Sequence, residues 1–89
     1  MTAPPAPRPL TQRQRDLLLH VAAGGTNAAI GHAMGIHAYT VAGRLGRIYA
    51  ALGVPDRASA LALAIYRGDI TPADLARIHG DRLPTTEGN

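Results

Sequence analysis

Apolar residues in the middle of the chain recur at helical spacing. Val41, Leu45, Ile48 and Leu52 are separated by four, three and four residues. At about 100° per residue, this spacing places them on one face of a helix over residues 38–53. Apolar positions at similar intervals predict further helices over about 11–23, 26–34 and 57–66, so the pattern predicts an all-α fold.

Helix start and stop signals separate these segments. Thr26 is a good N-cap for the segment 26–34, and Gly35 ends it as a glycine with positive φ would. The next helix restarts near Ala38. In the first helix, Thr11 and Gln14 have the spacing of a capping box. A short helix, a tight glycine turn and a longer helix form the layout of a DNA-binding helix-turn-helix.

The region from Leu10 to Ala64 resembles the LuxR/GerE-type helix-turn-helix domain. The matching positions are Leu10-Thr11-x-Arg13, Ala23-Gly24-x-Thr26-Asn27-x-x-Ile30, Met34-Gly35-Ile36, Thr40-Val41, Leu45, Ile48, Leu52-Gly53-Val54 and Arg57-x-x-Ala60. The resemblance implies a four-helix domain that binds DNA as a dimer, here free-standing, without a receiver or ligand domain. Two helix-capping positions depart from the family pattern: Gln14 replaces the usual Glu, and His37 replaces a capping Ser or Thr.

The segments outside this region are short. Residues 1–9 are rich in Ala and Pro and are expected to form a flexible arm. The arm is either a passive tail or a DNA contact through Arg8. Residues 67–83 form a C-terminal extension whose helix, over about 72–79, is capped by Thr71, with Pro72 at its first position and Asp74 at its third. Asp16, Asp69, Asp74 and Asp81 are expected at helix starts or on the surface, not as a convergent pair. Residues 84–89 are expected to fray.

The amino-acid composition indicates the size of the domain and where its positive charge lies. The 89 residues contain no Phe, Trp or Cys, so one small domain with a thin core is expected. All nine basic residues other than His are Arg. Residues 1–54 hold five of them against one acid, whereas residues 55–89 hold four against five acids. An excess of positive charge in the helix-turn-helix half suits a surface that meets phosphates, although an asymmetry this small also arises by chance on a solvated surface.

Several classes of function lack support in the sequence. The chain has no phosphate-binding loop, no dinucleotide fingerprint and no nucleophile elbow, so we expect neither an enzyme nor a cofactor. The four His residues fall on different predicted elements without a carboxylate cluster, which argues against a metal site. No apolar stretch reaches membrane-span length. The expected location is the cytoplasm, with association to the nucleoid when the protein is bound to DNA.

The third helix carries the candidate DNA contacts. In the family, base edges are read from the positions of Ala42, Gly43 and Gly46, and here all three are small. Including the start of the second helix, the candidate DNA-binding residues are Thr26, Asn27, Tyr39, Thr40, Gly43, Arg44, Gly46 and Arg47. Three interpretations remain open. The glycines allow the helix backbone to approach DNA closely, with ionic contacts from Arg44 and Arg47, or binding rests on phosphate contacts and dimer geometry. Alternatively, the smooth stripe formed by Ala42, Gly46 and Ala50 packs against another helix, and DNA binding has been lost or altered.

The fourth helix is the candidate dimerisation element. The resemblance implies that role for its apolar face, which consists of Ala58, Leu61, Ala62 and Ile65. The same face could instead close the core. We therefore expect a homodimeric transcriptional regulator that binds the major groove of double-stranded DNA. The alternative is a protein-interaction module of the same fold that binds another regulator or RNA polymerase without specific DNA readout.

Overall fold

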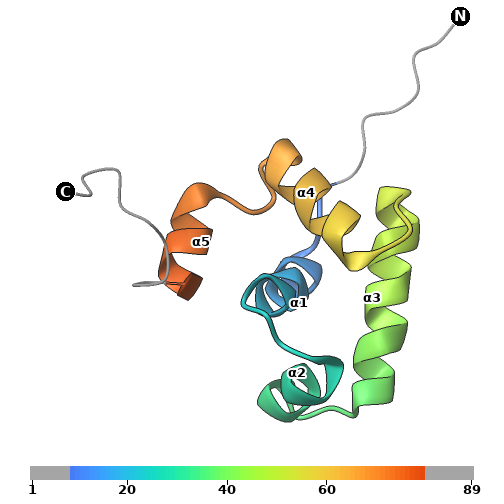
Figure 1. The fold of residues 1–89 in the computed structure, drawn as a ribbon. Helices are drawn as coiled ribbons and strands as arrows, with labels where there is room; N and C mark the ends of the chain where they lie inside the picture. The colour runs from blue at the N-terminus through green and yellow to red at the C-terminus, as the bar shows by residue number, and fades with distance from the viewer. Residues whose placement is uncertain (1–8, 80–89) are drawn as a thin grey trace, which may run out of the picture.

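The computed structural model describes residues 9–79, which form five α-helices and no strand (Figure 1). The helices are α1 (Gln12–Ala22), α2 (Asn27–Met34), α3 (Ala38–Leu52), α4 (Arg57–Arg67) and α5 (Pro72–His79). Helix α1 lies in the middle and contacts each of the other four. The predicted all-α fold is confirmed. The predictions for residues 1–8, for the end of the C-terminal extension at 80–83 and for the tail 84–89 lie outside the described residues.

The helix starts follow from local capping. Thr11 and Gln14 form the predicted capping box on α1, with Thr11 Oγ1 accepting from the Gln14 N–H at 3.1 Å. Thr26 Oγ1 caps α2 by accepting from the Ala29 N–H at 3.1 Å. His37 makes no side-chain capping bond, so α3 has the weak start predicted for it. Asp56, which the sequence analysis did not single out, caps α4 through Ser59, and this backbone hydrogen bond lowers the pKa of Asp56.

The turn between α2 and α3 depends on two glycines. Gly35 ends α2 with a φ of 72°, a left-handed conformation that glycine adopts without steric cost. Gly31 is buried inside α2, and a Cβ atom on it would lie only 2.5 Å from the Ile36 carbonyl oxygen. The Ile36 N–H donates to the Gly31 carbonyl at 2.9 Å. The absence of a side chain at Gly31 therefore lets the turn close tightly over α2.

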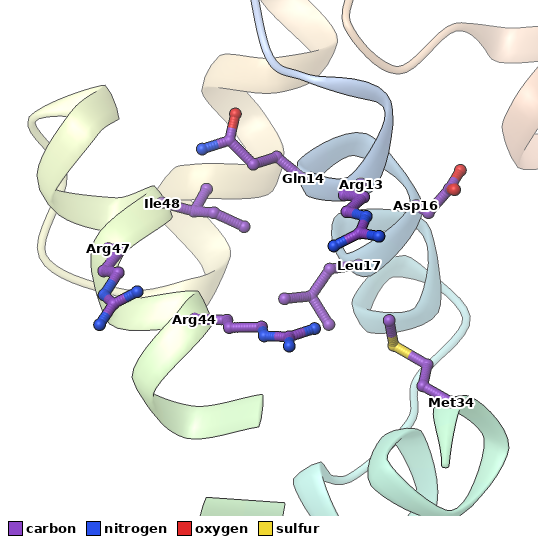
Figure 2. A pocket seen from close by; sticks show the side chains of 8 residues that line it. All are labelled: Arg13, Gln14, Asp16, Leu17, Met34, Arg44, Arg47 and Ile48. Carbon is purple, nitrogen blue, oxygen red and sulfur yellow. The ribbon is translucent and has the colours of Figure 1, made fainter. Parts of the chain in front are cut away.

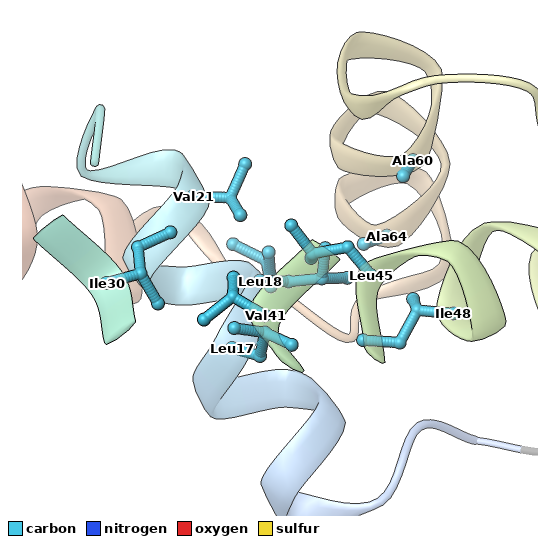
Figure 3. Close-up of a cluster of buried hydrophobic side chains, with 10 residues drawn as sticks. Leu17, Leu18, Val21, Ile30, Val41, Leu45, Ile48, Ala60 and Ala64 are labelled. Carbon is cyan, nitrogen blue, oxygen red and sulfur yellow. The ribbon is translucent and has the colours of Figure 1, made fainter. Parts of the chain in front are cut away.

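Ten residues from α1 to α4 and the following loop form the buried core (Figure 3). They are Leu17, Leu18, Val21, Ile30, Val41, Leu45, Ile48, Ala60, Ala64 and Ile70. The predicted inward face of α3 is confirmed by three of these residues, with Leu52 partly buried beside them. The prediction for α4 was incomplete, because its fully buried residues are Ala60 and Ala64, while Leu61 only packs against the edge of the core.

The segment after α4 is anchored to α1. Ile70 is fully buried, and Arg15 of α1 donates through Nε to the Asp69 carbonyl at 3.0 Å and through Nη2 to Asp74 Oδ1 at 2.7 Å. Asp69 also pairs with Arg67 at 3.2 Å. Asp74 lies in the first turn of α5, as expected for a helix start, but it is 4% exposed and therefore buried rather than on the surface. Burial of a carboxylate requires such partners, and Arg15 supplies the charge.

Asp74 is also held by its own helix start. Its carboxylate accepts from the Thr71 N–H at 2.9 Å and from Thr71 Oγ1 at 3.0 Å. The backbone hydrogen bond from Thr71 lowers the pKa of Asp74 from 3.8 to about 2, and Arg15 contributes, while burial opposes the shift. Because the folded-state pKa is depressed, the resulting stabilisation is complete above the unfolded value and is lost as the pH falls through about 2.

Candidate nucleic-acid interface

The outward surface of α3 is open at its two glycines, where no other part of the described chain packs against it. Gly43 and Gly46 are exposed, and a Cβ atom on either would meet nothing within 4 Å. Tyr39, near the start of α3, is 89% exposed, and Arg47 is exposed in the third turn. Thus neither glycine is required by packing within the fold, and the stripe is available to an external partner.

The start of α2 is partly occupied by a contact from α4. Arg57 Nη1 donates to the Gly25 carbonyl at 3.1 Å, and its Nη2 donates to Asn27 Oδ1 at 2.9 Å. Asn27 is half-buried, whereas Thr26 beside it is exposed. The side-chain oxygen of Asn27 therefore serves to join α2 to α4, a role that the sequence analysis did not predict.

Arg44 and Arg47 line an open groove of about 560 Å³ between α1 and α3 (Figure 2). Its other lining residues are Arg13, Gln14, Asp16, Leu17, Met34 and Ile48. The sequence analysis named Arg44 and Arg47 as candidate DNA contacts and did not assign Arg13 to the interface. The only sequence feature that pointed to a role for Arg13 at the interface was the excess of positive charge in the first 54 residues. That excess does not show which arginines lie close together in the fold.

The exposed face of α4 holds most of the candidate dimer residues. Ala58 and Ala62 are exposed, and Ile65 is 42% exposed. Leu61 is turned partly into the core. Tyr66, which the sequence analysis left out of this face, is 87% exposed at the end of the helix. These residues leave apolar surface on α4 without a partner in the described part of the chain.

Other kinds of site find no structural support between residues 9 and 79. That region contains no group of three His, Cys, Asp or Glu side chains placed to hold a metal ion. It also contains no single helix long and apolar enough to cross a membrane. Only α3 and α4 taken together reach that length and composition, and they are bent by 54° at the break between them.

A comparison with known families identifies the family to which this fold belongs. The sequence profile of GerE, described as bacterial regulatory proteins of the luxR family, matches residues 8–64, well over half of the chain. The chain belongs to the luxR family. No curated protein and no solved structure matches it.

Membership of the luxR family indicates what the helix-turn-helix does. Proteins of this family are regulators that bind DNA, and they are not enzymes in general. The matched region ends within α4, so the end of α4, Ile70 and the whole of α5 lie beyond it. The contact between Arg15 and Asp74 thus joins α5, which lies outside the matched region, to α1 within it.

Proposed function

We propose that this luxR-family protein regulates transcription by binding the major groove of double-stranded DNA through α3, as a homodimer held by α4. The observation that carries the proposal is the bare outward surface of α3. Tyr39, Gly43, Gly46 and Arg47 all lie exposed on a helix whose opposite face is fully used by the core. In a helix-turn-helix protein, that outward surface enters the major groove.

The small residues Gly43 and Gly46 on α3 favour DNA binding dominated by contacts with the phosphate backbone of the DNA. Direct base readout uses long polar side chains, and α3 offers Tyr39, Thr40, Arg44 and Arg47 for such contacts. Arginines that meet phosphates contribute affinity irrespective of sequence. We therefore propose modest base readout, reinforced by phosphate contacts and by the spacing of two half-sites in a dimer.

The proposal for the dimer rests on the exposed face of α4. Ala58 and Ala62 lie one turn apart and continue toward Ile65. Small side chains permit two helices to approach closely, and the exposed side chains of Ile65 and Tyr66 supply apolar area. Two copies joined through α4 would each present α3 to a separate half-site.

A second candidate function has its own supporting observation. Ala42, Gly46 and Ala50 form a smooth, exposed stripe on α3, and Gly43 beside it is also open. A helix of another regulator or of RNA polymerase could pack against this stripe without any DNA readout. The three exposed arginines between α1 and α3 favour the DNA proposal, because an apolar helix interface gives them no counter-charge.

Arg47→Ala should weaken DNA binding. If the guanidinium reads a base bidentately, the loss is about 1–3 kcal/mol and falls mainly on the preferred sequence. If it meets a phosphate, all sequences weaken alike. Gel-shift titrations at fixed salt, with Arg77→Ala on α5 as the charge-matched control, measure both cases. Affinity equal to wild type on every sequence would contradict a role for Arg47.

Gly43→Ala and Gly46→Ala should each stabilise the free protein. Ala is the better helix former by about 1 kcal/mol, and the added methyl group meets no atom of the described chain. Thermal unfolding measures this gain. If either glycine lies against DNA, the same variant should bind DNA less tightly while melting higher. Variants that melt higher and bind DNA as wild type does would show that no close approach occurs at these glycines.

A further inference from the structure

The arginines between residues 9 and 79 fall into two groups. Four of them have partners within the fold: Arg15, Arg57, Arg67 and Arg77. The other three are Arg13, Arg44 and Arg47. All three are exposed, and none makes a hydrogen bond or ion pair in the described part of the chain. The first group is thus held by hydrogen bonds or ion pairs within the fold, three of its members with carboxylates, whereas the second group has no such partner among the described residues.

The three unpaired arginines meet at one place although they come from two helices. Arg13 on α1 and Arg44 and Arg47 on α3 line the groove of about 560 Å³ between these helices. Figure 2 shows Arg44 extending from α3 across the groove toward α1. The groove is open to solvent on one side and floored by Leu17 and Ile48, which belong to the core cluster.

The positive charge of the groove is poorly balanced. Among residues 9–79, Asp16 is the only carboxylate that lines it, against three arginines. Its Oδ1 atom accepts from Gln12 Nε2 at 2.7 Å, and Figure 2 shows its carboxylate pointing away from the three guanidinium groups. Gln14 is neutral, and its side-chain oxygen accepts from the Thr11 N–H. A group with several anionic oxygens would relieve this repulsion, and guanidinium groups bind phosphate oxygens with good geometry.

We propose that Arg13, together with Arg44 and Arg47, binds the phosphate backbone of the DNA strand that flanks α3. This inference rests on the proposed function. Arg47 belongs both to the outward surface of α3 and to the groove, so a strand that meets that surface passes the mouth of the groove. Arg13 thereby extends the interface from the helix-turn-helix to α1.

The salt dependence of binding tests this inference. The affinity of the full chain for one duplex of fixed sequence is measured over a series of KCl concentrations. Each phosphate contact contributes about 0.9 to the slope of log affinity against log salt. Arg13→Ala should lower the magnitude of the slope by about that amount and weaken binding at every salt concentration within the series. Arg13→Lys should keep the slope, because it keeps the charge.

Two controls separate this effect from general ones. Arg77→Ala removes the same charge from α5, on the other side of α1 from α3, and should leave the slope at the wild-type value (Figure 1). Circular dichroism melts check that each variant folds, which the exposure of Arg13 leads us to expect. Should Arg13→Ala not fold, Arg13→Gln is used instead, because glutamine is also neutral but keeps a longer side chain than alanine.

The possible failures are distinct. A wild-type slope in Arg13→Ala, with the wild-type protein binding DNA normally, would overturn this inference and leave the proposed function standing. A wild-type protein that binds no duplex would overturn the proposed function itself. The same variants titrated with inorganic pyrophosphate and followed by NMR identify a third case. Pyrophosphate binding that Arg13→Ala abolishes, beside an unchanged DNA slope, would assign the groove to a free phosphate compound and overturn the DNA contact.

Discussion

Gly31→Ala should destabilise the protein, although alanine is normally the better residue inside a helix. The added Cβ atom would lie 2.5 Å from the Ile36 carbonyl oxygen and 3.2 Å from the Ala38 nitrogen. These are backbone atoms of the turn, so they cannot move aside as a flexible side chain would. We expect a net loss of about 1–3 kcal/mol in the free energy of unfolding, typical of overpacking.

Urea unfolding followed by circular dichroism measures this loss, with Gly43→Ala as the matched control. Both variants make the same substitution inside a helix of the helix-turn-helix, but the methyl group at Gly43 meets nothing within 4 Å. The control should therefore be stabilised while Gly31→Ala is destabilised. Because the turn sets the angle between α2 and α3, Gly31→Ala should also lose DNA affinity. A Gly31→Ala variant as stable as Gly43→Ala would contradict the tight packing of this turn.

Ala62→Arg should separate the proposed dimer into monomers. Ala62 is exposed in the middle of α4, so a long charged side chain there leaves the fold intact but prevents two α4 helices from approaching. Each half-site would then bind independently. Because the benefit of linked binding is lost, the apparent affinity for a two-half-site DNA should fall by about 10²-fold or more.

Sedimentation of the free protein and of its DNA complex measures this change. Ala76→Arg adds the same charge at an exposed position of α5 and should behave as wild type. A wild-type chain that remains monomeric at high concentration, and that binds DNA as one protomer per site, would exclude the dimer proposed here.

The helices were predictable from sequence because each has a strong local signal. Thr11 with Gln14, Thr26 and Gly35 mark ends that the structure places within one residue of those predicted. The inward face of α3 was equally clear, since Val41, Leu45 and Ile48 are large apolar residues at helical spacing and all three are buried. Local chemistry and core packing agree in these segments, and in such segments a sequence pattern is most informative.

The missed features depend on contacts between distant residues. Ala60 and Ala64 form the buried face of α4, but alanine is common on both faces of a helix and gives no contrast in a periodic pattern. The burial of Asp74 depends on Arg15, which lies 59 residues away. Gly31 is required because the turn after α2 folds back over it, a contact that the spacing of apolar residues does not encode.

The candidate interface was only partly predicted, because it too depends on contacts between residues that lie far apart in the sequence. The exposed positions of α3 followed from helical periodicity, and the structure leaves Tyr39, Gly43 and Arg47 exposed. The groove that Arg13 shares with Arg44 could not be predicted, because it depends on how α1 crosses α3. The bond from Arg57 to Asn27 likewise depends on the position of α4 beside α2.

Selection of DNA sequences by the wild-type chain from a random library tests the central proposal most directly. A homodimer that presents α3 twice should enrich an inverted repeat whose half-sites are about one helical turn apart, or a multiple of that distance. Recovery of such a repeat, lost with Ala62→Arg and kept with Ala76→Arg, is the predicted result. Recovery of no sequence above background, at salt concentrations where the protein is folded, would contradict specific DNA binding and favour the protein-interaction function.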